Sequence, residues 1–259
     1  MSDVEPADTG AGPAAAADTP NEHTHVIIPA GHHRGESMTL GQRVWYRVLW
    51  WVVQIVARGV FRVRVSGKEN LPTTGAFIVS PIHRSNLDTP LLGVITRRRM
   101  RYMGKETLWK SKFGAWFLSG AGGFPVERGT VDRAALRACL EVVERGEPLV
   151  MFPEGTRQHG PVTQHFFDGP AYVACRAQVP IVPIGIGGSE RAMPKGKKIP
   201  RPTRMTIVIG EPIQPPAPEA NGRVPRRVVQ GLTQQLKVVV QDLFDQAQVL
   251  AGTPNPPQD

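Results

Sequence analysis

Cysteine is scarce in this chain of 259 residues. The two cysteines, Cys139 and Cys175, form no CxxC pair or other metal-ligand spacing. Disulfide-stabilised secreted domains and zinc modules need several cysteines at regular spacings, so the sequence predicts neither and is typical of a reducing compartment. Four of the seven histidines fall within residues 23–33, where a polar tail rich in Ala and Pro explains them better than a metal site. We therefore expect no metal.

Long hydrophobic runs are also missing. The strongest apolar stretch, residues 48–57, is interrupted by Gln54 and lies between Arg47 and Arg58. It is well short of the roughly 20 apolar residues that span a bilayer. The N-terminus lacks the basic start and apolar stretch of a secretory signal. The sequence therefore predicts a protein that does not cross the membrane by itself and stays on its cytoplasmic side.

Two kinds of functional motif are absent. The chain contains no Gly-x-Ser-x-Gly elbow, which disfavours a serine hydrolase. It contains no recognisable RNA- or DNA-binding motif, so its basic character does not indicate a nucleic-acid partner. A basic peripheral protein that binds a membrane without catalysis remains as a non-enzyme alternative.

Negative charge is concentrated at one end of the chain. Residues 1–36 hold six acidic residues and one basic residue, a net charge of −5, so the rest carries +14 within the overall charge of +9. A body this basic is expected to meet an anionic partner. Two basic clusters are candidates for contacts with anionic headgroups or other phosphates, with a solvated surface as the equal alternative. They are Arg97, Arg98, Arg99 and Arg101, and Lys195, Lys197, Lys198, Arg201 and Arg204.

Composition divides the chain into four parts. Residues 1–40 and 249–259 are predicted to be disordered tails, because they are rich in Pro and polar residues and lack apolar periodicity. Residues 41–64 are predicted to form an amphipathic helical segment that mixes arginines with aromatics. Its tryptophans are Trp45, Trp50 and Trp51. Such a segment suits the headgroup boundary of a membrane, and the alternative is a helix that docks on the core. Residues 65–248 form the main domain.

Short apolar runs alternate with helical patterns along residues 65–248. Runs rich in Val and Ile and bounded by Gly or Pro predict strands at 76–80, 149–152, 181–186 and 205–209. Apolar residues at helical spacing predict helices over 130–145 and near 228–243. This alternation predicts one α/β domain with a central, largely parallel or mixed sheet flanked by helices. The membrane-associating helical segment precedes it.

A histidine and an aspartate follow the first predicted strand, in the sequence Ile-His-Arg-Ser-Asn-Leu-Asp at 82–88. On a regular helix, His83 and Asp88 would point about 140° apart and would not meet. If the chain turns after the strand and a helix starts near 85–90, Asp88 can accept one imidazole N–H and leave the other nitrogen as a base. The alternative is a loop histidine beside a helix-capping aspartate.

Two later segments offer groups that suit an anion. Arg128 lies in a glycine-rich turn before a predicted helix, where its guanidinium and nearby N–H groups fit a phosphate; a surface arginine in a turn is the equal alternative. The sequence Phe-Pro-Glu-Gly-Thr-Arg at 152–157 follows a buried strand, at the end where α/β proteins place ligand groups. There Gly155 lets a ligand approach the backbone, and Arg157 offers a second anion contact. Glu154 can bind a hydroxyl, hold an arginine, or form a structural ion pair with Arg157.

Together these blocks resemble the glycerolipid acyltransferase family of 1-acylglycerol-3-phosphate and glycerol-3-phosphate acyltransferases. The resemblance covers about residues 65–210. It comprises, in family order, His-x4-Asp at 83–88, Phe-Pro-Val-Glu-Arg-Gly at 124–129, Phe-Pro-Glu-Gly-Thr-Arg at 152–157 and Val-Pro-Ile-Val-Pro-Ile at 179–184. The resemblance implies that His83 and Asp88 are catalytic. It implies that the acceptor is bound by Arg128, Glu154, Gly155, Thr156 and Arg157, with Lys105 as a further contact.

The resemblance also implies a reaction and its partners. An acyl group would pass from acyl-CoA or acyl carrier protein to the free sn-2 hydroxyl of 1-acylglycerol-3-phosphate, making phosphatidic acid in phospholipid biosynthesis. The alternatives are acylation of glycerol-3-phosphate or of another lysophospholipid. The expected partners are the glycerol-phosphate lipid, the acyl thioester and an anionic membrane surface, with no cofactor beyond the thioester co-substrate. The expected location is the cytoplasmic face of the plasma membrane, as a peripheral or monotopic protein.

Three positions depart from the family pattern. Ile82 stands where members often carry Asn before the histidine, so the supporting contact of that amide is missing. Asp168 stands in Phe-Asp-Gly at 167–169, where many members have Phe-Lys-x-Gly. Any phosphate contact from that lysine is therefore in doubt. Glu127, where aspartate is common, is a minor change.

Overall fold

One mixed β-sheet runs through the computed structural model of the chain, which describes residues 38–126, 133–194, 196–197, 199–219 and 223–256. Within these residues the sheet has seven strands in the order β1-β7-β6-β2-β5-β3-β4. The strands are β1 Arg64–Ser66, β2 Ile78–Pro81, β3 Arg101–Lys105, β4 Gly123–Val126, β5 Leu149–Val150, β6 Ile181–Gly187 and β7 Thr206–Ile209.

Strand direction brings the sequence motifs to one edge of this sheet. The neighbouring strands β6, β2, β5, β3 and β4 all run parallel, whereas β7 runs antiparallel to β6 and parallel to β1. Parallel strands share one carboxyl edge, so the segments that leave this edge lie next to each other. Residues 82–88 follow β2, residues 152–157 follow β5, and Lys105 and Val126 end β3 and β4.

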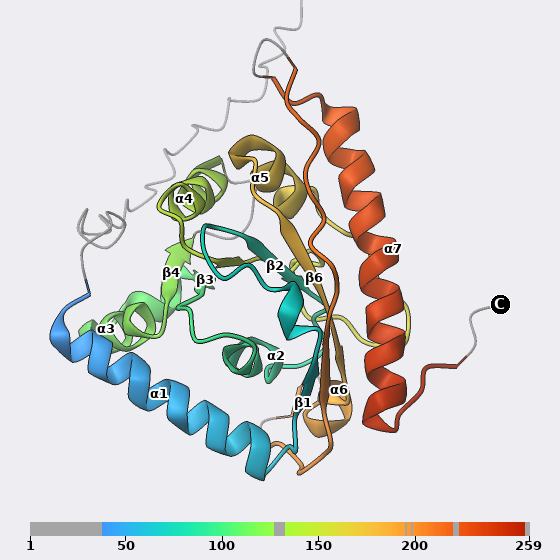
Figure 1. The fold of residues 1–259 in the computed structure, drawn as a ribbon. Helices are drawn as coiled ribbons and strands as arrows, with labels where there is room; N and C mark the ends of the chain where they lie inside the picture. Colours follow the sequence, from blue (N-terminus) through green and yellow to red (C-terminus); the bar gives the residue numbers. More distant parts are fainter. Residues whose placement is uncertain (1–37, 127–132, 195, 198, 220–222, 257–259) are drawn as a thin grey trace, which may run out of the picture.

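Helices surround the sheet (Figure 1). They are α1 Leu40–Gly59, α2 Asp88–Leu91, α3 Lys112–Gly120, α4 Arg133–Glu144, α5 Gly169–Ala177, α6 Ser189–Ala192 and α7 Arg226–Ala251, with 3-10 turns η1 Lys68–Asn70, η2 Leu92–Val94 and η3 Glu106–Trp109. Figure 1 shows α7 along one side of the domain and α1 with α3 on the opposite side. No helix among the described residues is long and apolar enough to cross a bilayer.

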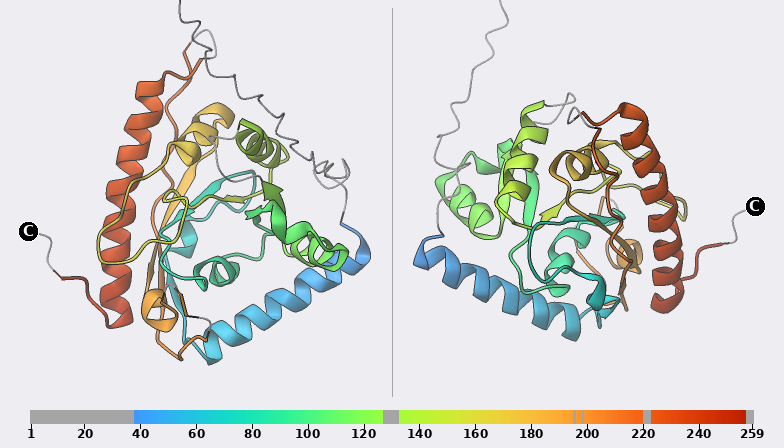
Figure 2. Two further views of the ribbon diagram at one scale, coloured as in Figure 1. Left: turned by 180° about the vertical axis from the view of Figure 1, so that it is seen from behind. Right: turned by 45° about the horizontal axis from the view of Figure 1, so that its top comes forward.

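Helix α7 packs directly on β6 because two glycines leave room for its backbone. A Cβ atom at Gly185 would lie 2.1 Å from the Leu243 carbonyl oxygen, and one at Gly187 would lie 2.1 Å from the Ala247 carbonyl oxygen. No real Cβ tolerates such distances, so both positions require glycine for close approach. The two further views in Figure 2 show α7 beside the sheet along its length.

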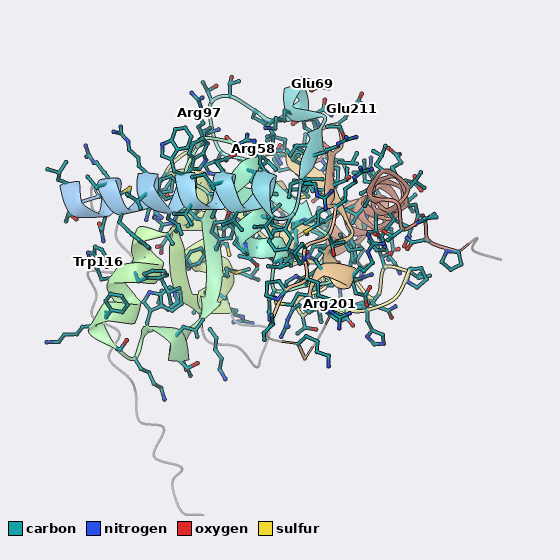
Figure 3. The ribbon with its side chains drawn as sticks, turned by 90° about the horizontal axis from the view of Figure 1, so that it is seen from below. Arg58, Glu69, Arg97, Trp116, Arg201 and Glu211 are labelled. Atoms are coloured by element: carbon teal, nitrogen blue, oxygen red, sulfur yellow. The ribbon has the colours of Figure 1, made fainter. Side chains whose placement is uncertain are left out.

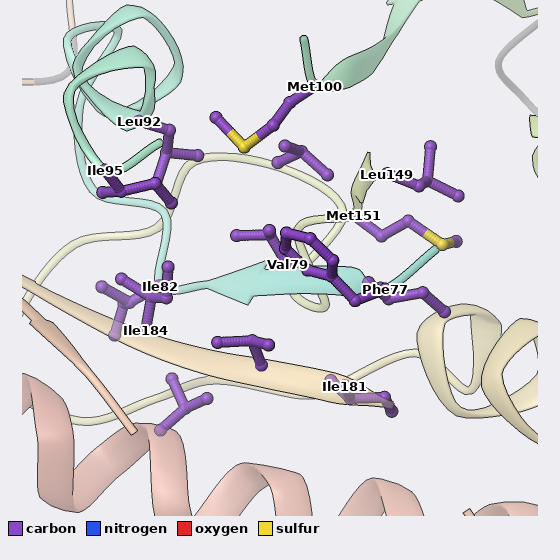
Figure 4. Packing of buried hydrophobic residues seen from close by; sticks show 14 of the residues in the cluster. Phe77, Val79, Ile82, Leu92, Ile95, Met100, Leu149, Met151, Ile181 and Ile184 are labelled. Atoms are coloured by element: carbon purple, nitrogen blue, oxygen red, sulfur yellow. The ribbon is translucent and has the colours of Figure 1, made fainter. Parts of the chain in front are cut away.

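Strand β2 lies at the centre of the hydrophobic core. All four of its residues are buried, as expected for a parallel strand that is covered on both faces. Figure 4 shows Ile82 beside Ile184 of β6, while Leu149 and Met151 lie on the other side of Val79. The turn after β2 therefore leaves from a tightly packed and fixed position.

The predicted α/β fold is confirmed, and β2, β5, β6 and β7 lie where the sequence predicts strands, with small shifts at their ends. Strands β1, β3 and β4 were not predicted. β3 mixes Arg, Gly and Lys, and β4 contains Gly and Pro, so neither shows the run of Val and Ile that indicates a strand. Their pairing with neighbours in the sheet overrides this weak local preference.

Two predicted boundaries differ from the structure. Helix α1 ends at Gly59, so Arg64 lies in β1 and not in the helical segment predicted for 41–64. Helix α7 continues to Ala251, and the tail predicted for 249–259 therefore begins inside this helix. Of the tail predicted for 1–40, residues 1–37 lie outside the described residues, and Leu40 already belongs to α1.

Candidate active site

The structure brings His83 and Asp88 together at the carboxyl end of β2. Nδ1 of His83 lies 3.0 Å from Oδ2 of Asp88, within hydrogen-bonding distance. The Asp88 side chain is fully buried, and 14% of the His83 side chain is exposed. The chain turns after Pro81 and α2 begins at Asp88, which is the geometry that the sequence predicts. With Nδ1 turned to the carboxylate, Nε2 is the nitrogen left to take a proton from a substrate.

Asp88 also fixes the turn that carries the histidine. Its Oδ2 accepts hydrogen bonds from the backbone N–H groups of Arg84 at 2.7 Å and Ser85 at 2.6 Å. The Ser85 hydroxyl in turn donates to the Met193 carbonyl at 2.9 Å. Asp88 is therefore a partner for the imidazole and a brace for the turn before α2, whereas the alternative of a helix-capping aspartate is wrong, because α2 begins after Leu87 and has no side-chain cap.

Phe152 is a neighbour of His83 that sequence reasoning did not single out. The phenyl and imidazole rings are stacked, with centroids 3.9 Å apart and planes at 25°. Phe152 begins the segment 152–157, so its place in the motif was visible, but its contact with the histidine was not. The stacked ring limits rotation of the imidazole about χ2 and covers one of its faces.

Glu154 differs from its predicted role as an acceptor contact. It is 1% exposed, and its carboxylate accepts from the Arg84 guanidinium and from the backbone N–H groups of His83 and Gln164. It pairs with Arg84 and not with Arg157, so the predicted ion pair within the motif is also not present. The possibility that Glu154 holds an arginine is the one that the structure supports.

Gly155, Thr156 and Arg157 lie closer to solvent than Glu154 does. Gly155 has φ +67°, and a Cβ atom there would lie 3.0 Å from the Phe167 ring, so glycine suits this turn. The backbone N–H of Gln158 donates to the His83 carbonyl at 2.9 Å, which places Arg157 next to the histidine turn. Arg157 is half-buried, and its guanidinium has no acidic partner within the described part of the chain.

Lys105 is the predicted acceptor contact that the structure places at the same edge of the sheet. Lys105 ends β3, is exposed, and is in register with Val126 of β4. Because neighbouring strands are about 4.8 Å apart, β3 lies roughly 10 Å from β2 across β5. Arg128, two positions after Val126, lies outside the described residues. Its predicted role therefore stays a prediction.

The first basic cluster has a mainly structural role. Arg98 donates to the carbonyls of Pro72, Gly75 and Gly146, and Arg99 donates to that of Ser119. Arg101 pairs with Glu147 at 3.2 Å. Burial lowers the pKa of the Arg101 guanidinium to about 10, against the opposing effect of Glu147.

Arg97 and the described members of the second basic cluster lie at the surface. Arg97 is exposed and lies over the Trp50 ring. In the other cluster, Lys197, Arg201 and Arg204 are exposed, and Lys195 and Lys198 lie outside the described residues.

Two departures from the family pattern acquire physical explanations. Ile82 is fully buried, and its backbone N–H donates to the Ile184 carbonyl at 3.0 Å, so it anchors the histidine turn by packing. Asp168 accepts a hydrogen bond from the Thr233 hydroxyl at 2.8 Å. This carboxylate ties the start of α5 to α7 and does not offer a cation to a phosphate.

Comparisons with known proteins agree with this geometry. The acyltransferase family model matches residues 62–187. The chain is 30% identical over 152 residues to 1-acyl-sn-glycerol-3-phosphate acyltransferase from Bacillus subtilis, covering 58% of this chain and 73% of that protein. It is 31% identical to a Chlamydomonas reinhardtii protein of the same name, covering 60% of this chain and 48% of the relative.

A solved structure shows the same fold. The crystal structure of the 1-acyl-sn-glycerophosphate (LPA) acyltransferase PlsC from Thermotoga maritima superimposes with a TM-score of 0.62 at 26% identity, over 80% of this chain and 83% of that one. The family-model match at 62–187 contains the strands β1 to β6, but not β7, and the turn with His83 and Asp88. The shared fold, the family model and the extent of the bacterial match lead to one conclusion: this chain belongs to the glycerolipid acyltransferase family and is an acyltransferase.

Proposed function

We propose that the enzyme transfers a fatty-acyl group from acyl-CoA or acyl carrier protein to the free sn-2 hydroxyl of 1-acylglycerol-3-phosphate, forming phosphatidic acid. The observation that carries this proposal is the 3.0 Å contact between His83 Nδ1 and buried Asp88, which leaves Nε2 as a base. The names of the relatives support the monoacylated acceptor. Acylation of glycerol-3-phosphate or of another lysophospholipid are the alternatives.

The reaction needs only one proton relay. Nε2 of His83 takes the proton of the acceptor hydroxyl while its oxygen attacks the thioester carbonyl carbon, and Asp88 stabilises the imidazolium that forms. The tetrahedral intermediate collapses as the C–S bond breaks. The thiolate leaves with the bonding electron pair and takes up the proton from the imidazolium. The products are the ester and a free thiol, and His83 returns to its starting state.

Cations at the carboxyl edge provide the proposed acceptor site. Arg157 lies beside the His83 turn without an acidic partner among the described residues, and an arginine fork suits a phosphate. Lys105 lies at the same edge, two strands from β2. Arg128 joins this group on the family resemblance alone. Binding the phosphate this way holds the glycerol hydroxyl in reach of the base, which lowers the entropic cost of the reaction.

A direct assay tests the proposal. The purified protein is incubated with labelled acyl-CoA or acyl carrier protein and, separately, with glycerol-3-phosphate, 1-acylglycerol-3-phosphate and a lysophospholipid that has a larger headgroup. Labelled phosphatidic acid from the monoacylated acceptor is expected, with His83→Ala as the inactive control. Transfer to glycerol-3-phosphate alone, or to none of the acceptors, would overturn the proposal.

The proposed anionic membrane partner rests on an exposed apolar surface. Side chains of α1, η3 and α3 form it; they are Leu40, Val44, Val48, Trp51, Val52, Ile55, Leu108, Phe113 and Trp116, here called the apolar face. In Figure 3, α1 crosses the molecule, and Trp116 and Arg97 lie on opposite sides of this helix. Arginines of α1 border this surface. Apolar insertion with basic flanks is typical of proteins that bind an anionic membrane surface.

The tryptophans of α1 do not share one environment, so the two interpretations of the segment, docking on the core and contact with a membrane, concern different side chains. Trp45 and Trp50 are half-buried, and their indole N–H groups donate to the carbonyls of Phe117 and Thr96. Trp51 is 61% exposed and belongs to the apolar face. One side of helix α1 thus packs on the domain, and the opposite side exposes the apolar face to solvent. The proposed location remains the cytoplasmic face of the plasma membrane, where anionic lipids attract basic proteins.

A further inference from the structure

A fully buried arginine contacts both the turn that carries His83 and the loop that follows Arg157. Arg84 follows the catalytic histidine in sequence and is 1% exposed. Its Nη1 donates to both carboxylate oxygens of Glu154 at 2.9 and 2.8 Å, and its guanidinium carbon lies 5.2 Å from the centroid of the Phe244 ring. An arginine is rarely buried this completely unless its donors are satisfied. The groups that accept hydrogen bonds from Arg84 therefore indicate its role.

One set of contacts fixes the base. Glu154 Oε2, which receives the Arg84 guanidinium, also accepts the backbone N–H of His83 at 3.1 Å. The backbone N–H of Arg84 donates to Asp88 Oδ2, the same oxygen that meets the imidazole. Arg84 therefore contacts both carboxylates that hold His83. Glu154 binds the backbone N–H of His83, and Asp88 contacts its imidazole ring.

A second set of contacts fixes the loop that follows Arg157. Nε of Arg84 donates to the Gly160 carbonyl at 3.2 Å, and Nη2 donates to the Val162 carbonyl at 3.0 Å. The other Glu154 oxygen accepts the backbone N–H of Gln164. Lysine, with one ammonium group, cannot reach the carboxylate and both carbonyls in this fork geometry.

The loop is also tied to the far side of the domain. Gln241 of α7 accepts the backbone N–H of Thr163 at 2.7 Å and donates to the Pro161 carbonyl at 3.0 Å. The side chain of Asn255 donates to the same carbonyl. The loop is thus held from outside by α7 and from inside by Arg84 and Glu154, so Arg84 joins the Gln158 N–H and Glu154 in linking the loop to the histidine turn.

We propose that Arg84 is a positioning residue that sets the distance between the base His83 and the acceptor-binding Arg157, with Glu154 as its partner. The inference rests on the proposed role of Arg157 in binding the acceptor phosphate. It assigns Glu154 to the support of the histidine and not to the acceptor. A displacement of about 1 Å between reacting groups lowers rates on the order of a hundredfold, so a device that fixes this distance matters for turnover.

The test uses a charge-neutral double variant, because removing one member of a buried ion pair leaves an uncompensated charge and endangers the fold. Arg84→Met with Glu154→Gln removes both charges, keeps similar volumes and retains an amide oxygen for the His83 N–H. Arg84→Lys is the conservative companion. The matched control is Arg101→Met with Glu147→Gln, which removes a half-buried ion pair between β3 and the segment before β5.

Two measurements separate positioning from stability. In acyl-transfer assays normalised to folded protein, we expect the double variant to lower kcat by about a hundredfold and to raise KM for the acceptor about tenfold, with KM for the thioester unchanged. The kcat and the acceptor KM of Arg84→Lys should lie between those of the double variant and wild type. The control should keep wild-type kinetic constants. A purely structural role would reduce the amount of folded enzyme and leave these constants alone.

The second measurement does not depend on activity. Hydrogen exchange should accelerate in peptides that cover 83–88 and 158–164 of the double variant, while peptides from β6 keep wild-type exchange. If wild type proves inactive with 1-acylglycerol-3-phosphate, the proposed function fails and exchange alone decides the positioning role. Unchanged exchange in both segments, or wild-type kinetic constants in the double variant, would overturn the role of Arg84.

Discussion

The imidazole of His83 rests on the phenyl ring of Phe152, with centroids 3.9 Å apart and planes at 25°. The base is therefore held on two sides, at its edge by the Asp88 carboxylate and on its face by an aromatic ring from a segment that follows a different strand. This contact makes Phe152 part of the surroundings of the proposed base.

Replacing Phe152 by Leu should lower kcat about threefold to tenfold and leave KM for the acceptor unchanged, because a stacked pair of this kind contributes about 0.5–1.5 kcal/mol. Phe152→Tyr keeps the ring and should retain nearly full activity. Steady-state kinetics with both substrates varied measures this. Equal activity of the Leu variant would show that the stack has no part in turnover.

His83→Ala should leave a folded protein whose acyl transfer is reduced by roughly a hundredfold or more, since general base catalysis contributes 10²–10⁴. Asp88→Asn should act in the same direction through loss of tautomer control, and should also loosen the turn that Oδ2 holds. Circular dichroism verifies the fold, and single-turnover assays measure the chemical step. Normal turnover without His83 would end the proposed mechanism.

Arg157→Ala should raise KM for the phosphorylated acceptor about tenfold or more with little change in KM for the thioester, because in the proposed site the guanidinium binds the acceptor alone. Arg157→Lys should recover part of the affinity, since it keeps the charge and loses the fork. Arg128→Ala should show the same pattern. If Arg157→Ala weakened thioester binding alone, the two substrates would be assigned to the wrong sides of the site.

Trp51→Ser combined with Ile55→Ser should weaken cosedimentation with anionic vesicles about tenfold or more, because both exposed side chains belong to the apolar face. The matched control is Val238→Ser with Val249→Ser, two exposed positions of α7 on the opposite side of the domain. Salt should weaken binding further, and deletion of residues 1–37 should leave it nearly intact. The same loss in both double variants would argue against this face.

Gly187→Ala should destabilise the fold by about 1–3 kcal/mol or more, because its methyl group would collide with the Ala247 carbonyl and push α7 off β6. Gly231→Ala, in α7 with open space around it, should be neutral or stabilise the protein by up to about 1 kcal/mol. Thermal unfolding of both variants measures the difference. A Gly187→Ala protein as stable as wild type would contradict the close packing of α7 on β6.

The sequence by itself determined the fold class and indicated His83 and Asp88 as the candidate catalytic pair. The run rich in apolar residues at 76–80, bounded by Gly and Pro, predicts a strand, and the fully buried strand β2 lies there with a small shift at its ends. On a regular helix His83 and Asp88 would not meet, so a contact between them predicts a turn before the helix, and the structure contains both the turn and the contact. These inferences hold because they depend on local geometry and on burial of apolar side chains.

Only the tertiary structure decided which charged and aromatic groups meet. Sequence gave no reason to pair Glu154 with Arg84 over Arg157, because the choice depends on β2 and β5 being neighbours in the sheet. It did not separate Trp50, which docks on the domain, from Trp51, which faces outward. Strand order and the close packing of helices on the sheet set these contacts between distant segments, and a periodicity along one segment carries no information about its neighbour.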